Sequence, residues 1–206
     1  MTVTVLIATH NRKKLVELNR ILAESAELTL VTAADVSPYP EPAETGATFA
    51  ENALIKAREG AARTGLPTVA DDSGLCVDAL YGAPGVFSAR WSGGHGDDEA
   101  NLRLLLAQIA DVPDDRRTAA FVCAAALVVP AGPSTPPTEH VVEGRLSGSI
   151  LREPRGEGGF GYDPIFVPEG HDVTTAELPA AEKDAISHRG QAFRALAPKL
   201  RELVDR

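Results

Sequence analysis

The stretch Val69-Ala-Asp-Asp-Ser-Gly-Leu-Cys-Val-Asp-Ala-Leu80 decides how the rest of this sequence is interpreted. The apolar run Thr68-Val-Ala is typical of the end of a buried strand, and Leu75-Cys-Val is typical of the start of another. The adjacent carboxylates of Asp71 and Asp72 are costly to bury without a cation or hydrogen-bond donors. Because neighbouring strand residues point to opposite faces, we expect one carboxylate to enter a cleft and the other to brace the loop.

The simpler alternative for residues 71–74 is a plain surface turn, because Asp, Ser and Gly are common turn formers. A functional loop is favoured over a turn if the rest of the chain supplies cations or hydrogen-bond donors for these carboxylates.

The composition is that of a globular, acidic chain. It has 206 residues, 44% hydrophobic and 24% charged, with a net charge of −9. This charge argues against binding to a nucleic acid polymer, which needs a basic stripe, but it allows a local basic pocket for a small anion. Cys76 and Cys123 lie in apolar runs and predict buried thiols in a reducing compartment. With no zinc-type spacing, no signal-peptide core and no bilayer-length apolar run, we expect a cytoplasmic protein that does not bind membranes.

The N-terminal segment predicts a buried strand over residues 3–8, followed by a helix from residue 12 to about residue 23. Arg12, Lys13 and Lys14 crowd the first turn of this helix, where the helix dipole disfavours cations. A bound anion would remove the conflict, because a helix N-terminus is a natural phosphate site. The alternative is three solvated surface charges.

A second helix is predicted to begin at the capping box Thr48-Phe-Ala-Glu51 and to end near Arg63. Glu44 lies on the proline-rich loop before this helix, and Lys56 lies on the helix itself. A surface position is the common fate of lysine, so Lys56 is either a phosphate contact or a solvated side chain.

The C-terminal third contains a glycine-rich loop, residues 156–164, with two aromatic side chains, and a last helix from about residue 191 to 204. Glycine allows close backbone approach, and an aromatic ring can stack on a base. Carboxylates suit magnesium, which bridges to substrate phosphates. These features together predict a nucleoside triphosphate site without a Walker loop.

Seven segments, in order along the chain, resemble the inosine triphosphate pyrophosphatase family, which hydrolyses ITP, dITP and XTP. They are residues 9–14, 44–53, 70–75, 84–90, 159–164, 182–183 and 187–190. One departure is His10, where the family often has Gly or Ser. The resemblance implies an α/β fold, with a long mixed central sheet flanked by helices in two lobes and an active cleft between them. It also implies a single domain over residues 1–206, a homodimer and Mg²⁺ as cofactor.

The resemblance further implies that water attacks the α-phosphorus and that pyrophosphate leaves a nucleoside monophosphate. It makes Asp72 the general base and, with Glu44, a magnesium ligand, while Asp71 supports the site without touching the substrate. The expected substrate-binding residues are Thr9, His10, Asn11, Arg12, Lys13, Lys14, Lys56, Ser73, Phe160, Gly161, Tyr162, Asp163, Lys183, His188 and Arg189.

Within this set, the residues around the first helix and Ser73 are expected at the phosphates. The segment Phe160–Asp163, with Lys183, His188 and Arg189, is expected at the base and ribose. Donors on His188 and Arg189 would match a 6-oxo purine and oppose the 6-amino group of adenine. If His188 binds no ligand, it is simply the residue at the start of the last helix.

Two other functions are compatible with the sequence. A magnesium-dependent nucleotide-sugar transferase would use the Asp pair as a metal motif but would need an acceptor. A non-catalytic nucleotide-binding module would bind nucleotide and magnesium without turnover, and the presence of both Glu44 and Asp72 argues against it.

Overall fold

The structure, a computed structural model, describes residues 2–9, 11–22, 28–132 and 135–204, without the side chains of residues 12, 19 and 22. The strands are β1 (Val3–Ile7), β2 (Leu28–Thr32), β3 (Thr68–Val77), β4 (Thr118–Val129), β5 (Thr138–Ile150) and β6 (Phe166–Pro168). The α-helices are α1 (Arg12–Leu22), α2 (Phe49–Thr64), α3 (Asp98–Gln108), α4 (Ala180–Ile186) and α5 (His188–Arg201).

The strands form one six-stranded sheet in the order β2-β1-β3-β4-β5-β6. Strand β1 runs parallel to both β2 and β3, whereas β5 and β6 are antiparallel, so the sheet is mixed as expected. The chain divides into two compact units. The first unit comprises residues 1–72, 123–143 and 189–206, and the second comprises residues 73–122 and 144–188.

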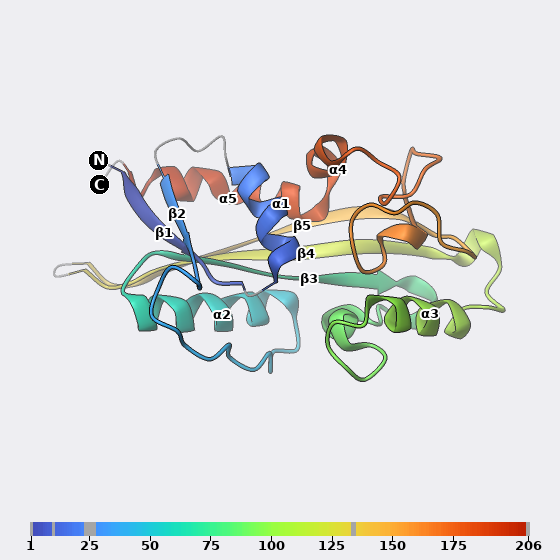
Figure 1. Ribbon diagram of the computed structural model, residues 1–206, viewed down its shortest axis with the longest axis horizontal. Helices are drawn as coiled ribbons and strands as arrows, with labels where there is room; N and C mark the ends of the chain where they lie inside the picture. The colour runs from blue at the N-terminus through green and yellow to red at the C-terminus, as the bar shows by residue number, and fades with distance from the viewer. Residues whose placement is uncertain (1, 10, 23–27, 133–134, 205–206) are drawn as a thin grey trace. The chain divides into compact units, whose positions relative to one another are not determined.

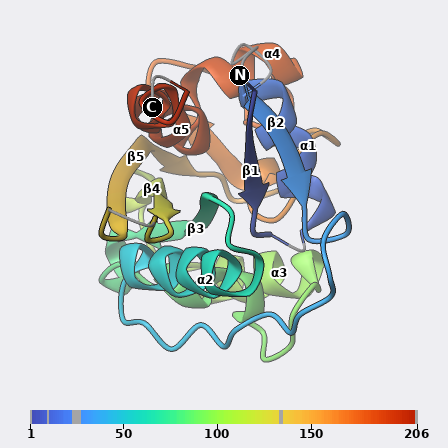
Figure 2. The same ribbon diagram turned by 90° about the vertical axis from the view of Figure 1, so that its left-hand side faces the viewer.

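The first unit is a three-layer arrangement, with α2 on one face of its strands and α1 and α5 on the other (Figures 1 and 2). Its core is built from apolar strand residues and the apolar stripe of α5. The fully buried members include Val5, Ile7, Leu18, Val69, Leu127, Phe193 and Leu196. The near-continuous apolar run of β1 fits this position, because both faces of the strand are covered.

Helix α2 begins where the capping box predicts and lies close to the sheet. Thr48 accepts a hydrogen bond from the backbone of Glu51, and Glu51 accepts one from the backbone of Thr48. Gly65 ends the helix in the left-handed conformation. At Gly60 an added Cβ would lie 2.8 Å from Thr68 Cγ2 and 3.0 Å from Leu6 Cδ2, so helix and sheet are in direct contact there.

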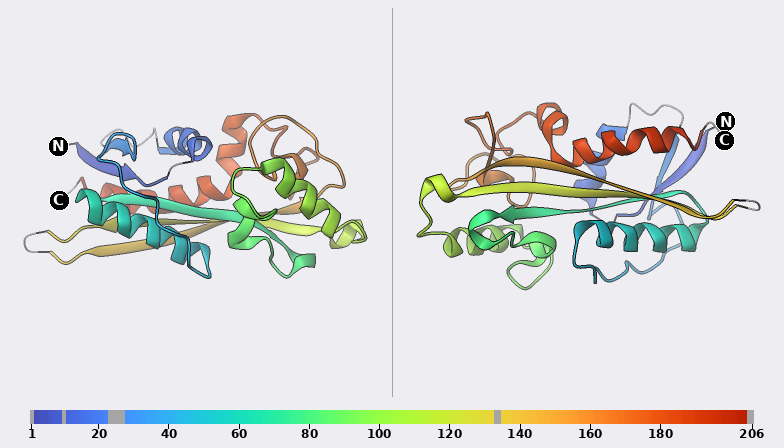
Figure 3. Two further views of the ribbon diagram at one scale, coloured as in Figure 1. Left: turned by 60° about the horizontal axis from the view of Figure 1, so that its bottom comes forward. Right: turned by 180° about the vertical axis from the view of Figure 1, so that it is seen from behind.

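The second unit places α3 on one face of its strands and the segment that contains α4 on the other (Figure 3). Leu105 and Ile109 of the α3 region are fully buried in the core of this unit. The guanidinium of Arg117 is buried and donates to the carbonyl oxygens of Ile109 (2.6 Å), Ile150 (2.9 Å) and Leu151 (2.9 Å). Arg117 therefore fastens the end of α3 to the end of β5.

The expected break in the sheet at residues 71–74 is wrong, because β3 runs unbroken from Thr68 to Val77. Asp71 and Asp72 therefore lie within a strand rather than at a strand end. Gly74 serves close packing instead of a turn. A Cβ added there would lie 2.4 Å from both the carbonyl oxygen of Gly85 and Oγ of Ser88.

Two further boundaries differ from the sequence expectation. Helix α5 begins at His188 rather than near residue 191, and the short helix α4 directly precedes it.

Within the described residues, no helix is long and apolar enough to cross a membrane.

The packing at Gly74 leads to a stability prediction. Gly74→Ala should lower the free energy of unfolding by about 1–3 kcal/mol, because the added methyl group overpacks a backbone contact. Gly94→Ala is the matched control, since a Cβ at that position meets nothing within 4 Å. Urea denaturation of both variants measures this free energy. An equal loss in Gly74→Ala and Gly94→Ala would contradict the prediction.

Candidate active site

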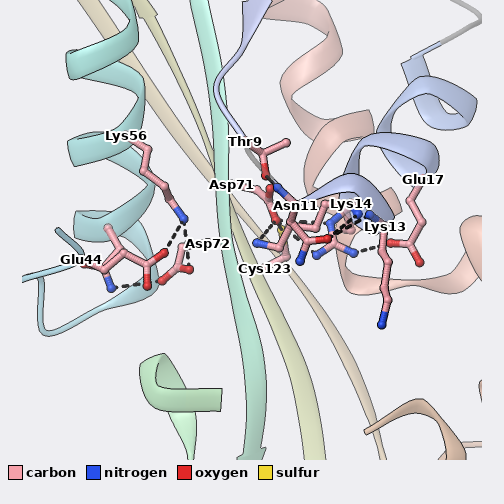
Figure 4. Close-up of polar contacts among 12 residues, drawn as sticks. Thr9, Asn11, Lys13, Lys14, Glu17, Glu44, Lys56, Asp71, Asp72 and Cys123 are labelled. Atoms are coloured by element: carbon pink, nitrogen blue, oxygen red, sulfur yellow. Dashed lines mark hydrogen bonds and ion pairs between the residues drawn. The ribbon is translucent and has the colours of Figure 1, made fainter. Parts of the chain in front are cut away.

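The acidic pair of β3 places one carboxylate on each face of the strand (Figure 4). Asp71 faces α1 and α5, whereas Asp72 faces α2. The strand periodicity predicts this separation. Each carboxylate is therefore surrounded by a different set of cations.

Asp71 is fully buried in a cationic environment. Its Oδ2 atom lies 3.1 Å from Lys14 Nζ and 3.3 Å from both Nε and Nη2 of Arg189. Burial alone would raise the pKa of Asp71, but these cations outweigh it and hold the pKa well below its usual value. Asp71 is therefore a buried, ionised carboxylate at neutral pH.

Arg189 is itself held by two carboxylates. Besides Asp71, its guanidinium contacts the buried carboxylate of Glu17 on α1. Although burial acts in the opposite direction, Asp71 and Glu17 raise the pKa of Arg189 further. The charged cluster Glu17–Arg189–Asp71–Lys14 thus joins α1, β3 and α5.

The start of α1 is capped by Asn11. Its Oδ1 atom accepts hydrogen bonds from the backbone N–H groups of Lys13 (2.9 Å) and Lys14 (3.2 Å), and Thr9 Oγ1 accepts one from Asn11 N–H (3.2 Å). The cationic first turn is partly explained by Asp71, which supplies an internal anion for Lys14. Lys13 is exposed.

Asp72 is held by two side chains from one face of α2. Lys56 Nζ lies 3.3 Å from Asp72 Oδ1, and Asn52 Nδ2 donates to Asp72 Oδ2 at 3.1 Å. Burial raises the pKa of Asp72 above its usual value, and the nearby lysines only partly offset the shift. Lys56 is 5% exposed, so the surface alternative for this lysine is wrong.

Lys56 also joins the predicted metal ligands to each other. Its Nζ atom lies 2.9 Å from Glu44 Oε1, so one ammonium group bridges Glu44 and Asp72. The carboxylates raise the pKa of Lys56 despite its burial. The described residues contain no group of three or more His, Cys, Asp or Glu side chains that could hold a metal ion. Two carboxylates around one positive charge nevertheless fit Mg²⁺, which commonly takes one or two protein carboxylates and completes its shell with substrate phosphates.

In the second unit, Asp163 organises the glycine-rich loop. Its Oδ2 atom accepts hydrogen bonds from the Phe160 backbone N–H and from Lys183 Nζ, both at 2.7 Å. Its Oδ1 atom accepts one from Thr175 Oγ1 at 2.8 Å. Gly159 has φ +71°, and a Cβ there would lie 2.1 Å from Asp163 Oδ2, so only glycine lets the loop fold over the carboxylate.

The aromatic side chains of the second unit differ in exposure and in their contacts. Lys183 Nζ lies 5.5 Å from the centre of the partly exposed Phe160 ring, and the His188 ring stacks on Phe121 with centroids 4.9 Å apart. Tyr162 instead belongs to the second-unit core and donates from its hydroxyl to the carbonyl of Ser88 at 2.9 Å. Its predicted contact with the base stays a prediction.

The structure thus gathers the predicted site residues into two groups. The first unit brings together, on the two faces of β3, Thr9, Asn11, Lys13, Lys14, Glu44, Lys56, Asp71 and Asp72 (Figure 4), and Arg189 joins them through its contact with Asp71. The second unit brings together Phe160, Asp163 and Lys183, and it also contains Gly161, Tyr162, His188 and Ser73, which directly follows Asp72 on β3. His10 and the side chain of Arg12 lie outside the described residues.

Two further residues, which the sequence did not single out, contact members of the first group. Glu17 and Asn52 are buried polar side chains on α1 and α2. Helical spacing offered a signal for Asn52, because it precedes Lys56 by four residues and so shares its face of α2. The partner of Glu17, Arg189, is too distant in the sequence for a comparable signal.

The mixed sheet flanked by helices and the acidic pair held by cations define the class of this protein, an α/β protein with buried ion pairs on its central strand. More particularly, the chain belongs to the Ham1 family, whose sequence pattern matches residues 5–199. The resemblance to inosine triphosphate pyrophosphatases is therefore confirmed.

Individual relatives match along nearly their whole length. A protein of Nocardia farcinica named dITP/XTP pyrophosphatase is 64% identical over 204 residues, which are 98% of this chain and 97% of that protein. The crystal structure of a nucleoside-triphosphatase, dITP/XTP pyrophosphatase, from Mycobacterium abscessus has 60% identity and a TM-score of 0.76, covering 96% of this chain and 99% of its own. A HAM1 protein from Coxiella burnetii has 43% identity and a TM-score of 0.86, with coverage of 98% and 100%.

The pKa shifts of Asp71 and Asp72 have opposite directions, and they predict that only the Asp71 carboxylate contributes strongly to stability. Asp71→Asn should lower the free energy of unfolding at pH 7 by about 3–5 kcal/mol, because it removes the ionised partner of the buried Arg189 and of the half-buried Lys14. Asp72→Asn should change it by less than about 1 kcal/mol, because burial already disfavours the charged form of Asp72.

Urea denaturation of both variants across a pH series measures this difference. The folded-state pKa of Asp71 is lowered, so its contribution is present above the ordinary carboxyl pKa of about 3.9 and is lost as the pH falls further. The difference in the free energy of unfolding between wild type and Asp71→Asn should therefore become smaller below about pH 4. Equal losses of unfolding free energy in Asp71→Asn and Asp72→Asn at pH 7 would refute the conclusion that only Asp71 stabilises the fold.

Proposed function

We propose that this protein hydrolyses non-standard purine nucleoside triphosphates, namely ITP, dITP and XTP, to the nucleoside monophosphate and pyrophosphate. The relatives named dITP/XTP pyrophosphatase support this proposal. The observation that carries it in this chain is the convergence of Glu44 and Asp72 on Lys56 Nζ, at 2.9 and 3.3 Å. These carboxylates around one buried cation have the chemistry of a phosphoryl-transfer site.

In this proposal Glu44 and Asp72 hold Mg²⁺, which when bound neutralises charge on the leaving pyrophosphate. Lys56, which bridges the two carboxylates, is proposed to exchange part of that contact for a phosphate oxygen. A lysine is suited to this exchange, because its ammonium is a compact charge on a flexible stem.

Asp72 is proposed as the general base that orients a water molecule and removes its proton during attack on the α-phosphorus. A base works best when its pKa is not far below the operating pH. Burial raises the pKa of Asp72 above that of an ordinary aspartate, which favours this role. Asp71, by contrast, is held ionised by Lys14 and Arg189 and so is suited to anchoring cations.

The phosphate chain is proposed to lie at the start of α1, where Thr9, Asn11, Lys13 and Lys14 offer N–H, hydroxyl and ammonium groups, with Ser73 contributing its hydroxyl. The exposed Lys13 and the partly exposed Lys14 supply positive charge at a helix N-terminus, which favours a polyanion. His10 and Arg12 belong to the same proposed segment.

The base and ribose are proposed to bind to the second-unit group. The ring of Phe160 is partly exposed above the loop that Asp163 supports, which suits stacking on a purine. His188 and Arg189 are proposed to supply donors for a 6-oxo group, with Lys183, Gly161 and Tyr162 completing the pocket. Arg189 contacts Asp71 and Glu17 in the structure, so its proposed contribution to base selection acts from within that cluster.

The proposal extends to the setting of the enzyme. We expect a cytoplasmic homodimer with Mg²⁺ as cofactor and a nucleotide as its small-molecule substrate. The family resemblance supports the dimer, and the net charge of −9 argues against binding to nucleic acid polymers.

A nucleoside triphosphate panel with pyrophosphate detection tests the activity. Wild type should release pyrophosphate from ITP and XTP in Mg²⁺, and far more slowly from ATP, whose 6-amino group would face a donor. Asp72→Asn should lose at least about 100-fold in kcat, the usual contribution of a general base, with the fold intact. Comparable values of kcat/KM for ITP and ATP would refute the base selectivity.

The same panel separates the two other candidate functions. A nucleotide-sugar transferase would release no pyrophosphate from a triphosphate alone, and a binding module would bind nucleotide without turnover. Near-wild-type activity of Asp72→Asn would remove that residue from the mechanism.

Lys14→Ala should weaken the binding of ITP more than that of IMP, because the lysine is proposed to face the phosphate tail. Arg189 still contacts Asp71 in this variant, so the fold should be retained. Calorimetric titration with a non-hydrolysable ITP analogue and with IMP measures the effect.

Lys199→Ala is the matched control, because it removes a lysine whose partner is the exposed Glu202. Equal losses for the two ligands would make Lys14 a purely structural residue.

A further inference from the structure

Asn52 is buried between the two segments that carry the proposed metal ligands. It is fully inaccessible to solvent and lies in the first turns of α2. Its Nδ2 atom donates to Asp72 Oδ2 at 3.1 Å, and its Oδ1 atom accepts from the Gly46 backbone N–H at 2.8 Å. Gly46 lies two residues after Glu44, so one amide group joins the Glu44 loop to Asp72.

The orientation of this amide follows from its neighbours. A backbone N–H needs an acceptor and a carboxylate needs a donor, so Oδ1 faces Gly46 and Nδ2 faces Asp72. The reverse orientation would place donor against donor and acceptor against acceptor. An apolar side chain of similar size would satisfy neither partner, and an aspartate would set a second negative charge against Asp72.

The loop is also packed directly on this amide. A Cβ added at Gly46 would lie 2.6 Å from Glu51 Cβ and 2.8 Å from Asn52 Oδ1, so the backbone reaches Asn52 only because residue 46 is glycine. On the other side, Lys56 occupies Asp72 Oδ1 at 3.3 Å. Asn52 and Lys56, four residues apart on one face of α2, therefore each hold one oxygen of Asp72.

We propose that Asn52 is a positioning residue that sets the Asp72 carboxylate and the Glu44 loop in the arrangement that binds the divalent cation. This inference rests on the proposed function of Glu44 and Asp72 as metal ligands. Groups that hold metal ligands in place from behind typically contribute 10–100-fold to metal affinity or activity. A residue that only stabilised the start of α2 would lack this effect.

The test compares Asn52→Leu with Glu51→Ala. Asn52→Leu keeps the size of the side chain but removes both hydrogen bonds. Glu51→Ala removes the neighbouring half of the capping box, whose Oε2 accepts from the Ala47 and Thr48 backbone, and leaves Asp72 untouched. Asn52→Ser is a second variant, whose side chain is too short to join Gly46 to Asp72. It tests the positioning role of Asn52 if Asn52→Leu fails to fold.

Binding of Mn²⁺ is followed by the electron paramagnetic resonance signal of the free ion, in the presence of a non-hydrolysable α,β-methylene analogue of ITP. Melting temperature and kcat in Mg²⁺ are measured in parallel. The Asn52 variants should bind Mn²⁺ about 10–100-fold more weakly, with a fall in kcat. Glu51→Ala should lower the melting temperature but leave the Mn²⁺ dissociation constant within about 2-fold of wild type, since it touches no metal ligand.

Wild-type Mn²⁺ affinity in the Asn52 variants would overturn the inference. So would a loss of affinity in both the Asn52 and Glu51 variants in proportion to their loss of stability, because that pattern marks a structural role. Absence of pyrophosphate release by the wild type would instead overturn the proposed function, and the Mn²⁺ comparison, which needs no turnover, would still decide the role of Asn52.

Discussion

The first unit depends on the balance of charge around the acidic pair of β3. Asp71 is buried, and a lone buried carboxylate would destabilise the fold by several kcal/mol. Lys14 and Arg189 offset that cost from α1 and α5, and Glu17 in turn balances Arg189. Because these contacts join segments from opposite ends of the chain, the buried charges also hold α1 and α5 against the sheet.

The second member of the pair has a different electrostatic character although it is the next residue along the strand. Asp72 faces α2, where Lys56 and Asn52 leave burial as the dominant influence on its pKa. One strand thus presents a carboxylate held ionised on one face and one with a raised pKa on the other. Two carboxylates whose environments separate their pKa values are the usual basis for dividing structural from chemical roles.

In both units, glycine and buried polar groups hold the loops that carry functional side chains. The loop of Glu44 rests on Asn52 at Gly46, and the loop of Phe160 closes over Asp163 at Gly159. Each loop hydrogen-bonds to a buried side chain through a backbone N–H, where a Cβ would prevent the approach. Positioning of this kind places a side chain without the cost of ordering a mobile loop during binding.

The sequence by itself determined the strand over residues 3–7, the first two helices and the chemistry of the candidate site residues. Strand periodicity separated Asp71 from Asp72, the capping box located the start of α2, and the ordered motifs identified the family, which the comparison with known proteins confirmed. Only the tertiary structure decided that β3 continues through residues 71–74, that Lys56 bridges Glu44 and Asp72, and that Glu17 and Asn52 are buried partners of the site. The physical reason is that local patterns report backbone preference and exposure, whereas a buried charge takes its partners from segments far away in the chain. The Asp-Asp-Ser-Gly stretch has the composition of a turn, and cations from α1, α2 and α5 make it stable as a strand.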